Sequence, residues 1–296
     1  MRKIVLLGIA LLLGATASRA QTLPFLLIPS DARPAALGNA SVALPGNTFA
    51  PDNSMAAAAL DNRTAAFGAG YNLWAPQTAK MGVAHLGGWY RTGRLAIGLG
   101  GRYCIEQPYD IVSGGGKTVG SYTPKEFSAS LGLAYRIAGP FSLGVTARLV
   151  SSDLAEKASG TAFGADISAM YAASGFSAAI GVSNLGTPIR YGSTSYAQPM
   201  LARAGGAYSA GGFTASLEAD YLFAGALMAG LGLEYCIADI VSLRGGFHYG
   251  DAAKALPTYA SLGLGLQYAG IRLDVTFLTA SKTLGNSLMV SLGYAF

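Results

Sequence analysis

Residues 286–296, which end the chain, read N-S-L-M-V-S-L-G-Y-A-F. From Leu288 to Phe296 every second residue is large, and the residues between them are mostly small. A period of two places the large side chains on one face of a β-strand and the small ones on the other. This pattern favours the closing strand of a bacterial outer-membrane β-barrel. It therefore predicts an even number of similar strands, a secretion signal and no membrane-spanning helix.

The composition agrees with a membrane barrel. Of the 296 residues, 51% are hydrophobic and 12% are charged, whereas soluble domains carry about 25% charged residues. Glycine (41 residues) and tyrosine (16 residues) are abundant, which suits strands and tight turns better than helices. A soluble β-sandwich would also alternate, but it would carry more charge and would not keep its polar residues on one face of every strand.

Residues 1–20 have the features of a secretory signal peptide. A positive start (Arg2, Lys3) precedes an apolar run over residues 4–13, and small residues stand at Ser18 and Ala20. The run is too short to span a bilayer as an anchor helix. We therefore expect cleavage after Ala20.

The charge and cysteine content exclude several classes of function. Without the signal peptide the chain carries 17 basic and 15 acidic residues, so nothing indicates a nucleic-acid surface. Cys104 and Cys236 are the only cysteines, and they make neither a disulfide framework nor a zinc site.

Residues 21–62 differ from the rest of the chain and are expected to form a plug or hatch inside the barrel. Five prolines rule out a continuous regular element, but short helices fit residues 31–37 and 54–60, the second with Asn53 as its N-cap. The apolar start would be costly to leave in water, as it would be in the alternative, a loose periplasmic arm. The side chains expected to hold the plug are Phe25, Leu26, Arg33 and Leu37.

Residues 63–296 alternate in a way that predicts a fourteen-stranded antiparallel β-barrel. Each predicted strand has the length needed to cross a bilayer at a tilt. The strands are centred on Phe67–Trp74, Met81–Tyr90, Leu95–Ile105, Phe127–Tyr135, Phe141–Val150, Phe163–Tyr171, Phe176–Ser183, Met200–Tyr208, Phe213–Tyr221, Leu227–Tyr235, Val241–Tyr249, Tyr259–Tyr268, Ile271–Leu278 and Ser287–Phe296.

The connections between these strands differ at the two ends of the barrel. Each even-numbered strand ends near a tyrosine and, except for the last, is followed by a short connection, whereas the connections over residues 106–124 and 184–198 are long. In outer-membrane barrels the short connections are periplasmic. We therefore expect these tyrosines to encircle the barrel at the periplasmic interface, where an aromatic side chain with one polar edge in water is favourable. We also expect both termini on the periplasmic side. The tyrosines are Tyr90, Tyr135, Tyr171, Tyr208, Tyr235, Tyr268 and Tyr294.

Polar residues follow one phase of the alternation and are expected to face the lumen, because a charge on the lipid face costs about 2–4 kcal/mol near the midplane for Arg or Lys. Glu126 and Asp166 share this phase. Two interpretations stay open: a polar binding site or solute path, or a salt-bridge network that fills the barrel and holds the plug. The polar cluster predicted for the lumen is Arg102, Arg148, Arg203, Glu218, Asp220, Glu234, Arg244, His248, Arg272 and Asp274.

Nothing in the sequence indicates catalysis, and we expect no cofactor and no metal. His85 and His248 have no metal-type partners nearby in the sequence, and no nucleophile lies in a known motif. The long loops carry aromatic and apolar residues that could contact partners or simply cover the surface. The residues predicted to contact partners are Tyr109, Ile111, Tyr122, Ile189 and Tyr191.

Two stretches, together with the strand count, resemble the PorV/PorQ family of outer-membrane proteins, relatives of the FadL-type barrels. Residues 25–40, FLLIPSDARPAALGNA, are similar to the opening pattern of the family, and residues 182–189, VSNLGTPI, are similar to the end of a middle strand. The chain departs from the family at Asn53-Ser54-Met55-Ala56, where an Asn-Pro-Ala motif is usual, and it is shorter than typical members.

The resemblance implies an accessory of the type IX secretion system. PorV-like members bind the C-terminal sorting domain of secreted cargo, and PorQ-like members belong to the attachment complex. FadL-like members instead pass hydrophobic molecules through the barrel, which is the alternative function. The expected partners are therefore outer-membrane lipid and either secretion-system proteins, cargo or a small hydrophobic molecule.

Overall fold

The computed structural model describes residues 23–75, 80–156 and 158–296. The predicted signal peptide, residues 1–20, lies outside the described residues. Within the described ranges, no helix is long and apolar enough to cross a membrane.

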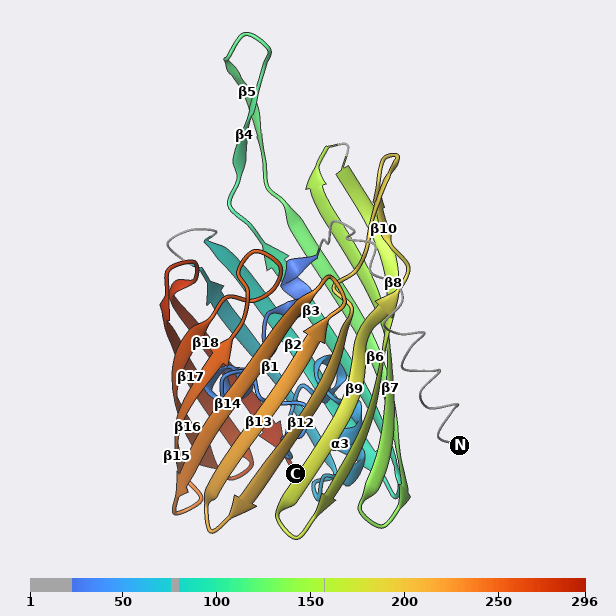
Figure 1. The fold of residues 1–296 in the computed structure, drawn as a ribbon, viewed down its shortest axis with the longest axis vertical. Coiled ribbons are helices and arrows are strands. Elements are labelled where there is room, and N and C mark those ends of the chain that lie inside the picture. The colour runs from blue at the N-terminus through green and yellow to red at the C-terminus, as the bar shows by residue number, and fades with distance from the viewer. Residues whose placement is uncertain (1–22, 76–79, 157) are drawn as a thin grey trace.

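Fourteen antiparallel strands close into a barrel (Figure 1). Each of the fourteen strands predicted from the sequence overlaps one of them, so the predicted fold is confirmed. Their order around the barrel follows the sequence, and two small hairpins form separate two-stranded sheets that are not part of the wall. The barrel strands are β1 (Ala65–Trp74), β2 (Met81–Thr92), β3 (Leu95–Ile105), β6 (Lys125–Ala138), β7 (Phe141–Ala155), β8 (Ala158–Ala173), β9 (Phe176–Gly186), β12 (Leu201–Ala210), β13 (Phe213–Leu222), β14 (Ala226–Ile237), β15 (Val241–Tyr249), β16 (Tyr259–Tyr268), β17 (Ile271–Ser281) and β18 (Gly285–Ala295).

The terminal strand closes the barrel against the first one. Strands β18 and β1 pair antiparallel, with Tyr294 opposite Phe67 and Leu288 opposite Leu73. Leu292 is 53% exposed on the outer face, whereas Ser291 is buried on the inner face. The alternation at the end of the chain therefore separates the outer face of the barrel from its lumen.

The outer wall is apolar and ends in an aromatic ring at the short connections. Six of the seven predicted tyrosines are more than a third exposed on this wall, and Tyr171 is half-buried between Phe141 and Phe176. A belt of large apolar side chains with a tyrosine edge is the surface that a bilayer stabilises.

The segment before β1 lies inside the barrel (Figure 1) and consists of short helical turns joined by irregular chain. Its elements are η1 (Pro24–Leu27), α2 (Ala32–Ala36), η2 (Ala50–Asp52) and α3 (Met55–Leu60). Asp31 caps α2 by accepting a hydrogen bond from the Arg33 backbone N–H. We call residues 23–62 the plug.

The predicted cap of the second helix is wrong. Ser54, not Asn53, occupies the N-cap of α3, and its side chain makes no capping hydrogen bond. The wall supplies a partner instead, since the Ala56 backbone N–H donates to Ser168 Oγ of β8. Asn53 is used elsewhere, as an acceptor from Arg203.

Glycines on the inner face allow the plug to approach the wall closely. A Cβ at Gly246 would overlap the backbone nitrogen of Gly38, and a Cβ at Gly232 would lie 2.5 Å from Leu37 Cβ. Gly98 faces Pro51, and Gly263 faces Ala36. At these positions the missing side chains leave room for the plug.

The two long loops contain small hairpins that the strand count did not anticipate. β4 (Tyr109–Val112) and β5 (Thr118–Tyr122) form one that extends away from the barrel (Figure 1), and β10 (Ile189–Tyr191) and β11 (Thr194–Tyr196) form the other. The end of the barrel that carries them is called the long-loop end, and the opposite end the short-connection end.

The plug runs through the lumen between these two ends. Leu23, its first described residue, packs in a cluster with Trp74 and Met81 at the long-loop end, whereas Thr64 bonds to Phe296 at the short-connection end. Both ends of the barrel therefore lie at the short-connection end, whereas the described plug begins at the long-loop end. The start of the chain lies outside the described residues, so the periplasmic location of both termini stays a prediction.

Candidate functional site: the plugged lumen and the long-loop end

All ten polar residues predicted to face the lumen do so, and all but Arg203 and Arg272 are buried. Nine of them fall into three ionic clusters, and each cluster includes atoms of the plug. The exception is His248, whose ring stacks on Tyr259 at 4.9 Å and whose Nδ1 lies 3.2 Å from the Gly38 carbonyl oxygen.

The first cluster joins α2 to strands β14, β15 and β17. Arg33 of the plug binds Glu234 through two hydrogen bonds of 2.7 and 3.0 Å. Arg244 bonds to the same carboxylate and to Asp274 at 2.7 Å. Arg272 also reaches Asp274 at 2.7 Å. Two carboxylates of the wall thus share three guanidinium groups, one of them from the plug.

The second cluster fixes the plug backbone to β12 and β13. Glu218 accepts hydrogen bonds from the backbone N–H groups of Ser41 (2.5 Å) and Val42 (2.7 Å). Arg203 binds the other oxygen of Glu218 at 2.5 Å and donates to the Asn53 carbonyl at 3.1 Å. Asp220 lies 3.6 Å from Arg203.

The third cluster surrounds Asp52 of the plug. Its carboxylate lies 3.6 Å from Arg102 and 3.7 Å from Arg148. Arg148 also binds Asp166 at 2.7 Å and the side-chain oxygen of Asn184 at 2.6 Å. The Asn184 backbone, with φ +59°, forms a bulge in β9 opposite Asp166. Sequence reasoning did not identify Asp52 or Asn184, because neither follows the strand alternation.

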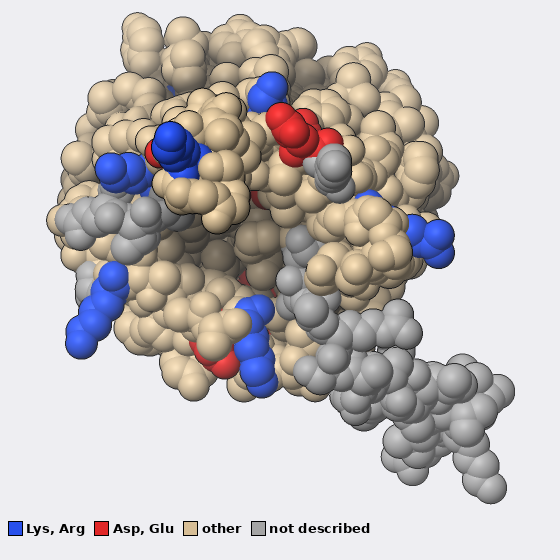
Figure 2. All heavy atoms as spheres, turned by 90° about the horizontal axis from the view of Figure 1, so that it is seen from above, with Lys and Arg blue, Asp and Glu red and all other residues tan. Residues whose placement is uncertain are grey.

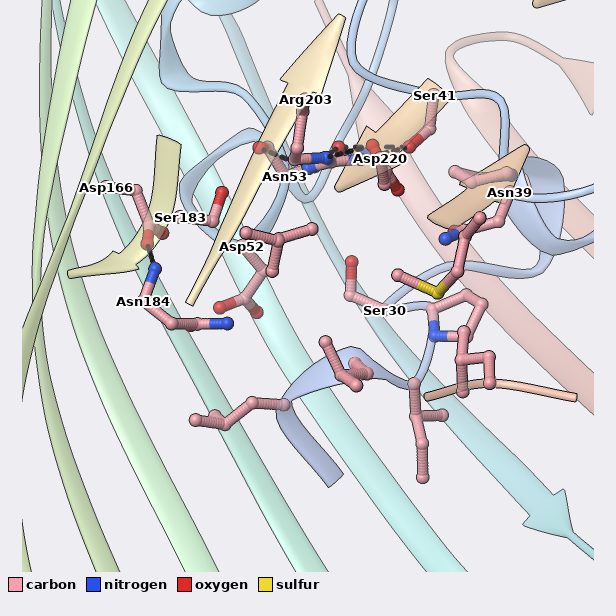
Figure 3. Close-up of a pocket in the computed structure, with 18 of the residues that line it drawn as sticks. Ser30, Asn39, Ser41, Asp52, Asn53, Asp166, Ser183, Asn184, Arg203 and Asp220 are labelled. Atoms are coloured by element: carbon pink, nitrogen blue, oxygen red, sulfur yellow. Dashed lines mark hydrogen bonds and ion pairs between the residues drawn. The ribbon is translucent and has the colours of Figure 1, made fainter. Parts of the chain in front are cut away.

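A small cavity lies between the second and third clusters (Figure 3). Its volume is about 50 Å³, and its lining includes Asp52, Asp166, Asn184, Arg203 and Asp220 together with apolar residues of the plug. Pockets that hold drug-sized ligands have about 300 Å³ or more. This cavity has the size of a few water molecules.

The long-loop half of the lumen contains a cluster of buried apolar side chains. Phe25 and Leu26 of the plug pack there with Trp74, Tyr259 and Ile189. Leu37, the fourth predicted plug residue, is also buried, nearer the short-connection end against Ala207. The predicted plug residues are thus all inside the barrel.

The β10–β11 hairpin folds inward over the lumen, and this corrects the expectation for Ile189, which is fully buried and cannot contact a partner. Tyr191 is half-buried, and its hydroxyl donates to Ser152 Oγ at 2.7 Å. Ser152 Oγ in turn donates to Glu126 at 2.9 Å.

The β4–β5 hairpin, in contrast, stands free of the barrel. Tyr109 and Tyr122 form its base and bond to β7, at the Leu154 carbonyl and at the Asp153 carboxylate. The hydrogen bond to Asp153 raises the pKa of Tyr122 to about 12. Val112 and Val119 are 57% and 66% exposed farther out, whereas the predicted Ile111 is half-buried. The exposed apolar surface of this loop is therefore made by valines that sequence analysis did not select.

Figure 2 shows the long-loop end, hollowed at its centre and surrounded by scattered basic and acidic side chains. All five described lysines lie in or beside connections at this end: Lys80, Lys117, Lys125, Lys254 and Lys282. Among the residues that the structure describes, no group of three or more His, Cys, Asp or Glu side chains could hold a metal ion.

Residues 15–210 match the family model of type IX secretion system protein PorV. The chain belongs to the PorV family. The match begins before the plug and ends with β12, so it includes both stretches on which the resemblance in sequence was based. None of the curated proteins matches this sequence.

Solved structures with the same fold are FadL-like barrels. The Ralstonia pickettii toluene transporter TbuX aligns over 92% of this chain and 100% of its own, with a TM-score of 0.68 and 13% identity. The Pseudomonas putida toluene transporter TodX aligns over 94% of this chain and 98% of its own, with a TM-score of 0.64 and 11% identity. A Pseudomonas aeruginosa FadL homologue aligns over 91% of this chain and 99% of its own, with a TM-score of 0.59 and 12% identity. At these identities the likeness shows a shared fold.

Proposed function

We propose that this PorV-family barrel is a type IX secretion accessory that binds protein partners at its long-loop end. The partners are secreted cargo, recognised through its C-terminal sorting domain, or subunits of the attachment complex. The observation that carries the proposal is the family match, which covers the plug and the strands that bear both hairpins.

The plugged lumen supports a docking role. The plug is bound to the wall by three ionic clusters, and the cavity beside it measures about 50 Å³. A solute path through the described lumen would require these contacts to break. The surface that remains for partners is then the loop end, where the β4–β5 hairpin presents an exposed strand pair to which an extended segment can add.

The proposed orientation places the long-loop end outside the cell and the short connections in the periplasm. Outer-membrane barrels combine short periplasmic turns with longer extracellular loops. Cargo that has crossed the membrane would then meet the hairpin at the cell surface.

Co-purification from the outer membrane of the source bacterium tests this function. The variant V112D/V119D places charges on the exposed valines, and G114D/G115D adds the same charges at the hairpin tip, where a side chain meets nothing within 4 Å. We expect tagged wild-type protein and the tip variant to retain sorting-domain cargo or secretion subunits, and the valine variant to lose them. Equal recovery with all three would contradict docking on the hairpin.

A FadL-like channel for small hydrophobic compounds is the second candidate. It is favoured by the fold shared with the two toluene transporters and by the apolar cluster next to the plug. The test is uptake of toluene by cells that produce the barrel. The docking role predicts uptake equal to that of cells without it, and a clear increase would favour the channel.

A further inference from the structure

A wide, open apolar groove runs along the outer face of strands β1, β2 and β3. Its volume is about 740 Å³, and Phe67, Leu86, Tyr90 and Leu99 are among the large side chains that border it. We call it the β1–β3 groove. It lies within the apolar belt of the barrel, so its occupant is a molecule of the membrane.

Outward-facing glycines form the floor of this groove. Gly88 stands between Phe67 and Leu99, and Gly101 stands opposite Leu86, in the register of the three strands. From Ile97 to Gly101, β3 extends about 13 Å at the usual rise per residue of a strand. This is a slot for part of an extended hydrocarbon chain.

Three arginines lie where the same wall meets the short-connection end. Arg91 is the last residue but one of β2, Arg94 precedes β3, and the backbone N–H of Arg136 in β6 donates to the Arg94 carbonyl. The side chains of Arg91 and Arg136 bond to backbone carbonyl groups only. The nearby carboxylate of Asp61 is already bound by Arg63 at 2.6 Å. The three guanidinium charges are therefore not neutralised by a carboxylate of the described chain.

A second groove on the same belt provides a comparison. It measures about 550 Å³, lies over β9 and β12–β15, and contains Gly206 and Gly245. The short connections below it, residues 174–175, 211–212 and 238–240, contain Asp239 and no basic residue. Of these two grooves in the described wall, the β1–β3 groove is the one that combines an apolar slot with cations at its membrane edge.

We propose that the β1–β3 groove binds one anionic phospholipid, with an acyl chain over Gly88 and Gly101 and the phosphate on Arg91, Arg94 and Arg136. Guanidinium groups bind phosphate through charge-assisted hydrogen bonds, and basic residues at a membrane surface attract anionic lipid. The lipid comes from the periplasmic leaflet, and this rests on the proposed orientation of the barrel, not on any cargo.

Native mass spectrometry of the purified full-length barrel tests the proposal. Phosphatidylglycerol or phosphatidylethanolamine is added to the protein in detergent, and the lipid that stays bound after release from the detergent is measured. We expect one phosphatidylglycerol to remain bound at concentrations where phosphatidylethanolamine does not. R94Q/R136Q should weaken the binding of phosphatidylglycerol about thirtyfold, at about fivefold for each charge removed near a membrane surface.

Matched variants distinguish lipid binding at this site from nonspecific binding through charge or hydrophobicity elsewhere on the barrel. K254Q/K282Q removes two cations at the other end, and G245L fills the second groove; both should leave retention unchanged. G101L fills the β1–β3 groove, and its Cβ would meet only Ser128 O at 3.6 Å, so the wall tolerates it while the lipid is lost. Equal retention of the two phospholipids, equal effects of the two double variants, or a preference for lipid A would overturn the proposal. Heat-modifiable electrophoretic mobility verifies that each variant is folded.

Discussion

Gly245 and Gly246 are neighbours on β15 that face opposite sides of the wall. A Cβ at Gly246 would overlap the Gly38 backbone, whereas a Cβ at Gly245 meets nothing within 4 Å. We expect G246A to destabilise the barrel by about 1–3 kcal/mol, the usual cost of overpacking, and G245A to have no such effect. Chemical unfolding of both variants in detergent measures the difference in their free energies of unfolding. Equal values would show that the plug is not closely packed against Gly246.

Arg33 is the cation through which the plug enters the first ionic cluster. Replacing it with glutamine leaves Glu234 and Asp274 with the wall arginines alone, and breaking a buried pair costs about 3–5 kcal/mol. R33Q should therefore unfold at lower denaturant concentration than wild type. The control is R190Q, which changes an exposed side chain of β10. A midpoint for R33Q within error of R190Q would contradict the assigned role of the cluster.

The direction of the polar side chains could be predicted from the sequence, but their partners could not. Alternation alone determines that Glu234 and Arg244 face inward, because a charge on the lipid face is costly. Pairing of Glu234 with Arg33 joins residues far apart in the chain, and no local pattern encodes that contact. For the same reason Asp52 and Asn184 were missed.

At the level of elements, the fourteen strands were predictable because each one repeats the same period of two between turn residues. The hairpins were not, since β4–β5 and β10–β11 are short and lie in loops rich in glycine and serine. The difference between them, one inward and one outward, depends on the packing of Ile189 against the lumen cluster and on the bonds of Tyr109 and Tyr122 to β7.

The attachment of the β4–β5 hairpin predicts that it can be removed without loss of the barrel. Its side-chain hydrogen bonds to the wall are those of Tyr109 and Tyr122, and most of its residues are exposed. Replacement of residues 109–122 by a short Gly-Ser linker should change the free energy of unfolding by less than about 1 kcal/mol, as for other surface changes. A large loss of stability would mean that the hairpin is part of the fold and not an appended surface.

At the scale of the whole molecule, the plug occupies the lumen of the barrel and is bound to its wall. We expect the wild-type protein to conduct no measurable current in planar lipid bilayers and a variant without residues 23–62 to conduct ions, because the emptied lumen is polar and water-filled. The deletion leaves wall charges such as Glu218 without plug partners, so its folding is verified by heat-modifiable mobility. Conduction by the wild type at the level of the deletion would contradict a stable plug.

Docking at the long-loop end is tested most directly by photo-crosslinking in living cells. A benzoylphenylalanine at the exposed Val112 of the hairpin should crosslink to a sorting-domain cargo or a secretion subunit, and one at Leu217, on the lipid-facing wall, should not. If the Val112 probe yields no protein adduct while the barrel is folded and produced at normal levels, partner docking on the hairpin is contradicted.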